Sequence, residues 1–238
     1  MGSPFLRQDS FEGQPDTTPA ELTCGEILVL GDSHAMVFAD PRFRAQFPLH
    51  SFDVVAIGGA TASGLENPNS KTQSAPKFLH AWRNSQARTV VVLLGEVDTG
   101  FVIWYRAEKY KAEVSQMLLN ALKSYQDFLT VLKNGHRVIC LSAPLPTIPD
   151  GQEWGEVANA RKAVRASQME RTTLTTRFNE GMRKFCAENG IGFLDLDDQS
   201  IGKDGLVDKR LLNSNPLDHH YEPRAYMEMM VPELRKRL

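Results

Sequence analysis

The sequence contains little cysteine, no dense block of positive charge and no long apolar run, and each shortage excludes a class of protein. Its 238 residues include three cysteines, Cys24, Cys140 and Cys186, and this odd, widely spaced set is not typical of a disulfide framework or a zinc knuckle. We expect buried thiols in a reducing compartment. The 27 Lys and Arg residues are dispersed and are balanced by 29 Asp and Glu residues, so we expect no nucleic-acid partner.

Motifs for membranes and nucleotides are also missing. No apolar run approaches the roughly 20 residues that span a bilayer, and the N-terminus lacks the basic-then-apolar order of a signal peptide. We therefore expect no membrane partner and a cytoplasmic location. The first predicted strand is not followed by Gly-x-Gly-x-x-Gly, and no Walker A lysine pattern is present, so nucleotide binding has little support. We expect no cofactor and no bound metal.

The hydrophobic pattern predicts one α/β domain over residues 23–238, preceded by a flexible tail over residues 1–22. Five continuous apolar runs indicate strands that are covered on both faces. These runs are 27–30, 53–57, 89–94, 137–141 and 192–196. Helical stripes over 118–132 and 174–185 end at Asn134-Gly135 and Asn189-Gly190. This alternation predicts a five-stranded, parallel, doubly wound sheet.

Polar or glycine-rich loops follow the first four predicted strands. They contain Ser33, Gly58-Gly59, residues 95–98 and residues 142–146. Because the carboxyl ends of parallel strands share one edge of a sheet, we expect these loops to converge on a single cleft. The stretch from Pro144 to about Glu170 is longer than an ordinary connection and is predicted to form a lid or rim that contains Trp154.

Ser33 is a candidate nucleophile because it follows the first strand, where backbone amides can hold both a hydroxyl and an oxyanion. The plain alternative is that Asp32 or Ser33 caps the next helix. Asp218-His219-His220, near the C-terminus, offers a base. Adjacent histidines point in different directions, so we expect only one to act, with Asp218 either orienting its ring or capping the helix near Pro223.

Two carboxylates, Glu96 and Asp98, follow the third strand, where burial makes unpaired charge costly. We expect them to find partners in Arg106, in a backbone nest or in the histidines. For Glu96 the favoured interpretation is a structural ion pair.

This order of motifs resembles the SGNH/GDSL hydrolase superfamily over roughly residues 26–238. Gly31-Asp32-Ser33 is similar to its Gly-Asp-Ser block, and the segment from His220 to Tyr226 is similar to its C-terminal block. The resemblance implies a three-layer, flavodoxin-like fold with Ser33 as nucleophile and His220, rather than His219, as base. It also implies an oxyanion hole formed by the amides of Ser33 and of Gly58 or Gly59.

Two departures from the family pattern bear on catalysis. Val97 stands where the Gly-x-Asn-Asp block has an asparagine that donates to the oxyanion, and loss of such a donor costs about 100- to 1,000-fold in rate. Asn67, Asn69 or Arg106 are candidates to replace it, and with Asp98 they are our candidate substrate contacts. The family's aspartate lies three residues before the histidine, whereas Asp218 lies two before His220, so a Ser/His dyad stays open.

We expect a serine esterase or acyltransferase that acts on a small acyl ester, such as an O-acetylated sugar. The loop after Gly59 and the Gly-Glu-Val-Asp block look similar to a divergent subgroup of bacterial proteins linked to surface sugars. One alternative is a metal-dependent phosphoesterase whose ligands would be Asp32, His34, Glu96, Asp98 and the histidine pair. The other is a non-catalytic domain that binds a saccharide or a protein. The oligomeric state stays open.

Overall fold

A computed structural model describes residues 25–151 and 164–238 of the chain. The expected flexible tail over residues 1–22 lies outside the described residues. So do Cys24 and the middle of the predicted lid or rim, which includes Trp154.

The centre of the molecule is a five-stranded parallel sheet with the strand order β2-β1-β3-β4-β5. The strands are β1 (Gly25–Gly31), β2 (His50–Ala56), β3 (Thr89–Leu93), β4 (Arg137–Leu141) and β5 (Gly192–Leu194). Gly31 is in register with Ala56 and with Leu93, so β1, β2 and β3 end together at one edge. The predicted doubly wound parallel sheet is confirmed, although β2 begins earlier than the apolar run suggested.

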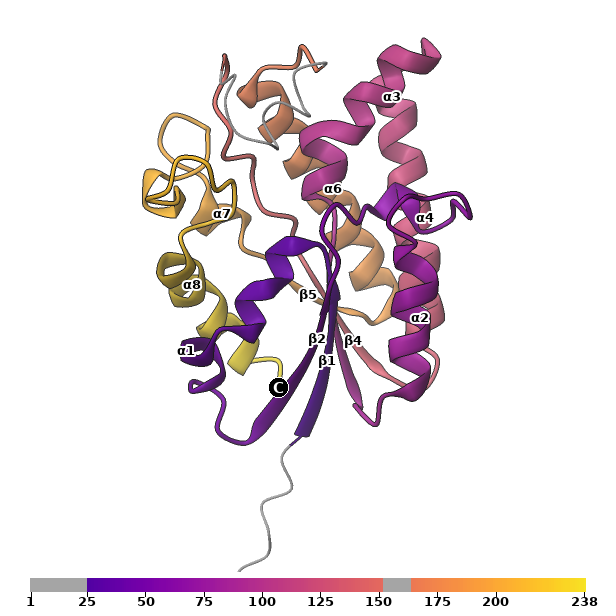
Figure 1. Ribbon diagram of the computed structural model, residues 1–238, viewed down its shortest axis with the longest axis vertical. Coiled ribbons are helices and arrows are strands. Elements are labelled where there is room, and N and C mark those ends of the chain that lie inside the picture. Colours follow the sequence, from indigo (N-terminus) through magenta and orange to yellow (C-terminus); the bar gives the residue numbers. More distant parts are fainter. Residues whose placement is uncertain (1–24, 152–163) are drawn as a thin grey trace, which may run out of the picture.

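Helices cover both faces of the sheet, which makes three layers (Figure 1). One face carries α2 (Ser74–Asn84), α3 (Ile103–Tyr110), α4 (Val114–Leu132) and α6 (Gln168–Asn189). The other carries α1 (Pro41–Arg44), α7 (Asp197–Ser200) and α8 (Pro223–Arg235). Among the described residues, no helix is both long enough and apolar enough to cross a membrane.

Alternate residues of each central strand enter two separate cores. Leu28, Leu30 and Val92 pack under α2, α4 and α6, whereas Val29 and Leu93 pack against the helices of the other face. The inner positions of β1, β3 and β4 are therefore apolar on both faces, which is why these strands appear in the sequence as continuous rather than alternating runs. Cys140 and Cys186 belong to the first core and are free, so the expectation of buried thiols is confirmed for these two.

Local signals place the helix ends. Ser167 and Glu170 form a capping box at the start of α6, and Gly190 ends this helix in the left-handed conformation with φ 62°. In α8, Pro223 occupies the first turn and the Glu222 side chain accepts a hydrogen bond from the Ala225 amide. Glu222 is thus the helix cap, which leaves Asp218 for another role.

Candidate active site

Ser33 lies at the end of β1, as the first residue of a short 3₁₀ helix (Ser33–Ala39). A side chain at Gly31 would place its Cβ 2.6 Å from the Leu93 carbonyl oxygen and 2.8 Å from the Ala35 Cβ, so the tight exit from the strand requires glycine. Asp32, not Ser33, caps the helix, because its Oδ1 accepts the His34 amide at 2.9 Å. The half-buried Ser33 hydroxyl makes no hydrogen bond with the described residues, so the capping alternative applies to Asp32.

His220 is oriented by Asp218. The Asp218 Oδ1 lies 2.6 Å from the His220 Nδ1 and also accepts the His220 amide at 3.0 Å. The Nε2 of the same ring is buried and has no hydrogen-bond partner among the described residues. An imidazole held in this way through Nδ1 presents Nε2 as a proton acceptor.

A loop between η4 (Lys209–Leu211) and α8 fixes Asp218 in turn. Asn213 Nδ2 donates to Asp218 Oδ2 at 3.0 Å, and the Asp218 amide donates to the Asn215 carbonyl at 3.0 Å. Partial burial raises the pKa of Asp218, but the hydrogen bonds from the His220 amide and ring outweigh it and hold this pKa below its usual value. Asp218 is therefore ionised at neutral pH. Sequence analysis missed Asn213, because its distance from Asp218 along the chain matches no recognisable motif.

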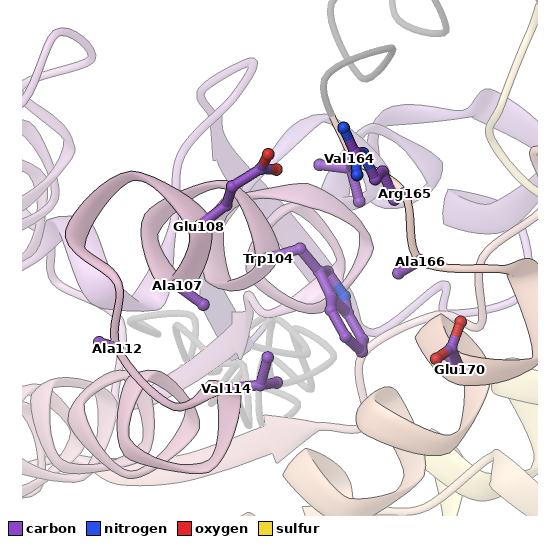
Figure 2. A pocket seen from close by; sticks show the side chains of 9 residues that line it. All are labelled: Trp104, Ala107, Glu108, Ala112, Val114, Val164, Arg165, Ala166 and Glu170. Atoms are coloured by element: carbon purple, nitrogen blue, oxygen red, sulfur yellow. The ribbon is translucent and has the colours of Figure 1, made fainter.

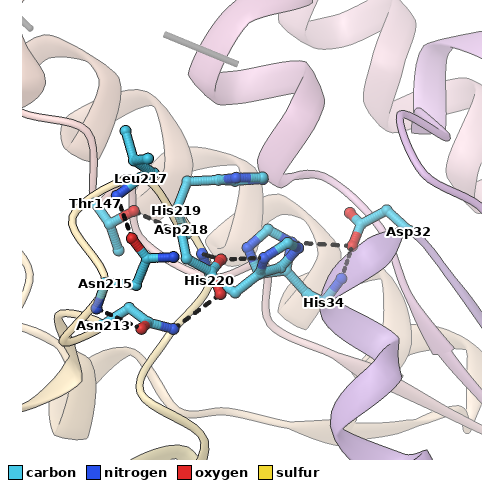
Figure 3. Close-up of polar contacts among 9 residues, drawn as sticks. All are labelled: Asp32, His34, Thr147, Asn213, Asn215, Leu217, Asp218, His219 and His220. Carbon is cyan, nitrogen blue, oxygen red and sulfur yellow. Dashed lines mark hydrogen bonds and ion pairs between the residues drawn. The ribbon is translucent and has the colours of Figure 1, made fainter. Parts of the chain in front are cut away.

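A third histidine, His34, lies against His219 and His220 (Figure 3). His34 is buried, and its Nδ1 lies 3.1 Å from Asp32 Oδ1. Its ring centroid is 4.7 Å from that of His220 and 5.6 Å from that of His219. Because His34 is the residue next to Ser33, this ring contact brings the serine turn and the C-terminal histidines together, as the motif order predicts.

The loop after β2 carries the candidate oxyanion amides. Among the described residues, none accepts a hydrogen bond from the exposed amides of Gly58 and Gly59. Gly59 has φ 72°, a conformation that favours glycine. The Ser33 amide opens its 3₁₀ helix, where leading amides have no partner within the helix. None of the three predicted donors therefore has a hydrogen-bond acceptor among the described residues.

Asp98 has a structural position rather than one in contact with a substrate. Its side chain is fully buried, and its oxygens accept the amides of Ala62 at 2.6 Å and Ser63 at 3.0 Å. Burial raises its pKa, opposed by hydrogen bonds from Ser63 and Ala62 and by the charge of Arg106. The prediction that Asp98 contacts a substrate is corrected here, because no face of this carboxylate is accessible. Its role is to hold the loop after β2 against the end of β3.

The remaining residues singled out in the sequence range from exposed to buried. Asn67 and Asn69 are exposed, and the Asn67 Oδ1 accepts the Asn69 amide in a local turn. Arg106 is half-buried on α3, with its charge acting on Asp98. Glu96 is buried with 2% of its surface exposed. Val97 immediately precedes a π-helical turn (Asp98–Val102), a distortion that is frequent at functional sites.

A pocket of about 380 Å³ opens between α3, the start of α4 and the segment that leads into α6 (Figure 2). Trp104 projects into it, and Glu108, Arg165 and Glu170 supply charge at its wall. The Trp104 Nε1 donates a hydrogen bond to the Thr99 carbonyl oxygen at 2.7 Å, which fixes the orientation of the indole. None of Ser33, Asp218 or His220 lines this pocket, so it is distinct from the histidine cluster.

The sequence matches no known protein-family model and no curated protein. The structure does have solved neighbours. A Bacteroides fragilis protein provisionally assigned as an acylhydrolase aligns at TM-score 0.59 and 14% identity, over 92% of this chain and 90% of that one. A GDSL-like lipase from Bacteroides thetaiotaomicron aligns at TM-score 0.54 and 14% identity, over 89% and 86%. An extracellular lipase from Streptomyces rimosus aligns at TM-score 0.53 and 14% identity, over 90% and 100%.

These neighbours share the same three-layer architecture over nearly the whole chain. The three-layer, doubly wound α/β fold implied by the Gly-Asp-Ser and C-terminal motifs is therefore confirmed, and these solved neighbours share it. Identities at this level establish the fold alone, so the chemistry must be argued from the side chains of this chain.

Proposed function

We propose that the protein is a serine esterase of the SGNH type. Ser33 attacks the ester carbonyl while His220 Nε2 takes the hydroxyl proton, and Asp218 stabilises the resulting imidazolium. The tetrahedral intermediate collapses as His220 returns the proton to the leaving alcohol. Water then attacks the acyl-serine by the same proton path, which releases the acid and restores Ser33.

The observation that carries this proposal is the Asp218–His220 hydrogen bond of 2.6 Å, which leaves Nε2 with no hydrogen-bond partner beside the Ser33 turn. It also favours a triad over the Ser/His dyad, because Asp218 reaches the ring although it lies only two residues before it. The amides of Ser33, Gly58 and Gly59 supply oxyanion donors where Val97 supplies none.

The substrate class we propose is a small acyl ester, with an O-acetylated sugar as the first class to examine. The resemblance to SGNH hydrolases linked to surface sugars supports this choice. A nucleophile on a rigid strand end, with exposed glycine amides beside it, is also compatible with a small acyl group that approaches the backbone.

The test is hydrolysis of p-nitrophenyl acetate by metal-free wild type and by three variants checked by circular dichroism. Ser33→Ala and His220→Gln are expected to lose at least about 1,000-fold in kcat/KM, because members of a triad act as a unit. Ser115→Ala, on the exposed surface of α4, is the matched control and should keep wild-type turnover. Turnover that survives Ser33→Ala would refute the assignment, and labelling by a fluorophosphonate should be confined to proteins that retain Ser33.

A further inference from the structure

Three of the six histidines in the sequence lie together, although one is near the start of the domain's sequence and the other two are near its end. His34 follows β1, and His219 and His220 precede α8. The centroids of His219 and His220 are 4.2 Å apart, and each ring offers a nitrogen within 4.8 Å of the others (Figure 3).

These separations are close to those of a metal site. Zinc–nitrogen bonds of about 2.0–2.1 Å in a tetrahedral arrangement place neighbouring ligand nitrogens about 3.3 Å apart. Pairs within 4.8 Å therefore need to approach by about 1.5 Å at most, a displacement that ring rotation can supply. The His220 side chain is 32% exposed, so the cluster is not sealed from solvent.

The surroundings of the rings are those of metal-bound histidines. Such a histidine usually gives its other ring nitrogen to a carboxylate, which fixes the tautomer and the ring orientation. Asp32 does this for His34, and Asp218 does it for His220, each from two residues earlier in the chain. Asn213 in turn supports Asp218. The two carboxylates also offset the charge of a divalent cation.

We propose that His34, His219 and His220 bind one divalent transition-metal ion, with Zn²⁺ the best fit to three neutral imidazoles. The ligand set differs from the metal-dependent phosphoesterase considered above, because Asp98 is engaged by the amides of Ala62 and Ser63. The favoured interpretation of the sequence assigned no metal, and these three histidines were named together only among the ligands of the alternative phosphoesterase.

Metal binding has a consequence that rests on the proposed esterase function. His220 Nε2 cannot accept the Ser33 proton while it donates its lone pair to a metal. Zinc occupancy and serine catalysis therefore exclude each other, and the same imidazole makes the hydrolase sensitive to zinc.

The binding test is isothermal titration of chelator-treated, buffer-exchanged full-length protein with ZnCl₂. Wild type and Ser33→Ala should bind one ion per chain. His34→Gln and His219→Gln should each lose at least about tenfold in affinity, and Asp32→Asn about 10- to 100-fold, as for outer-shell partners of zinc ligands. His80→Gln, on the exposed surface of α2, is the matched control and should bind as wild type does.

Three results would overturn the proposal or its consequence. Absence of stoichiometric binding by wild type refutes the site whatever the hydrolase activity is. Unchanged affinity in His219→Gln, whose half-exposed ring makes it the variant safest to fold, refutes the ligand set. Zinc that binds an active enzyme without lowering p-nitrophenyl acetate turnover refutes the mutual exclusion. Failure of metal-free protein to hydrolyse the ester counts against the esterase alone, because the titration with Ser33→Ala does not depend on turnover.

Discussion

Asp197, the first residue of α7, should make the protein less stable as the pH rises from about 4 to 7. Burial raises its pKa from the ordinary 3.8 to about 7, with the charge of Asp195 adding to the effect. Its side chain is 14% exposed, and the hydrogen bond from Asn179 at 2.7 Å offsets only part of the cost of burial. The folded protein thus holds a proton on Asp197 at a pH where the unfolded chain has released it.

The sign and size follow from proton linkage. Below about pH 4 both states are protonated, and Asp197 makes no difference to stability. Between the two pKa values the folded state binds more protons, so the free energy of unfolding falls by about 1.36 kcal/mol for each unit that the pH rises. Above pH 7 the whole cost is present, roughly 4 kcal/mol for a shift from 3.8 to about 7.

Asp197→Asn removes this cost, because an amide does not ionise and its oxygen still accepts from Asn179. Urea unfolding followed by circular dichroism at pH 5 and pH 8.5 should show the variant gaining about 3 kcal/mol over wild type between the two conditions. Asp53→Asn, at an exposed position of β2, is the matched control and should follow wild type. Parallel pH dependence of wild type and Asp197→Asn would show that the carboxylate is ionised throughout and would refute the reasoning.

The remaining predictions concern the site. Asp218→Asn should lower kcat of ester hydrolysis by about 10- to 150-fold, the worth of one charge-assisted hydrogen bond of 1.5–3 kcal/mol; an unchanged kcat would establish a dyad. Val97→Asn restores an oxyanion donor and should raise kcat at least about tenfold, measured against Val97→Thr as a control of similar size. Asp98→Ala leaves the amides of Ala62 and Ser63 without acceptors, so thermal unfolding should show a loss of about 1–3 kcal/mol.

The architecture could be predicted from the sequence because its signals are local. The short run 89–94 is rich in β-branched residues and predicts a strand covered on both faces, and Gly190 ends α6 in the left-handed conformation. Parallel order then places the residues that follow β1, β2 and β3 at one edge of the sheet. The meeting of the Ser33 turn with His220 followed from the motif order for the same reason.

The details of the site were less accessible, because they depend on the conformations of loops. Asp98 was expected near a substrate, but its partners are two backbone amides 35 and 36 residues earlier. Because every residue except proline has a backbone amide, the sequence does not show which of them will bind a carboxylate. His34 was considered only as a ligand of the alternative metal-dependent phosphoesterase. Its contact with His220 arises only once the loop before α8 has folded across the end of β1.

The same local hydrogen-bonding arrangement occurs in two segments, Asp32-Ser33-His34 and Asp218-His219-His220. In each, the aspartate accepts both the amide and the ring nitrogen of the histidine two residues later, so the orientation of the imidazole is set within three residues. This explains how Asp218 can serve His220 from a position nearer than the one typical of SGNH hydrolases. It also explains why two such units, once brought face to face by the fold, form a cluster that can offer its nitrogens to a proton or to a metal ion. Under the two proposals above, the occupant of the cluster decides whether the chain hydrolyses an ester or holds a cation.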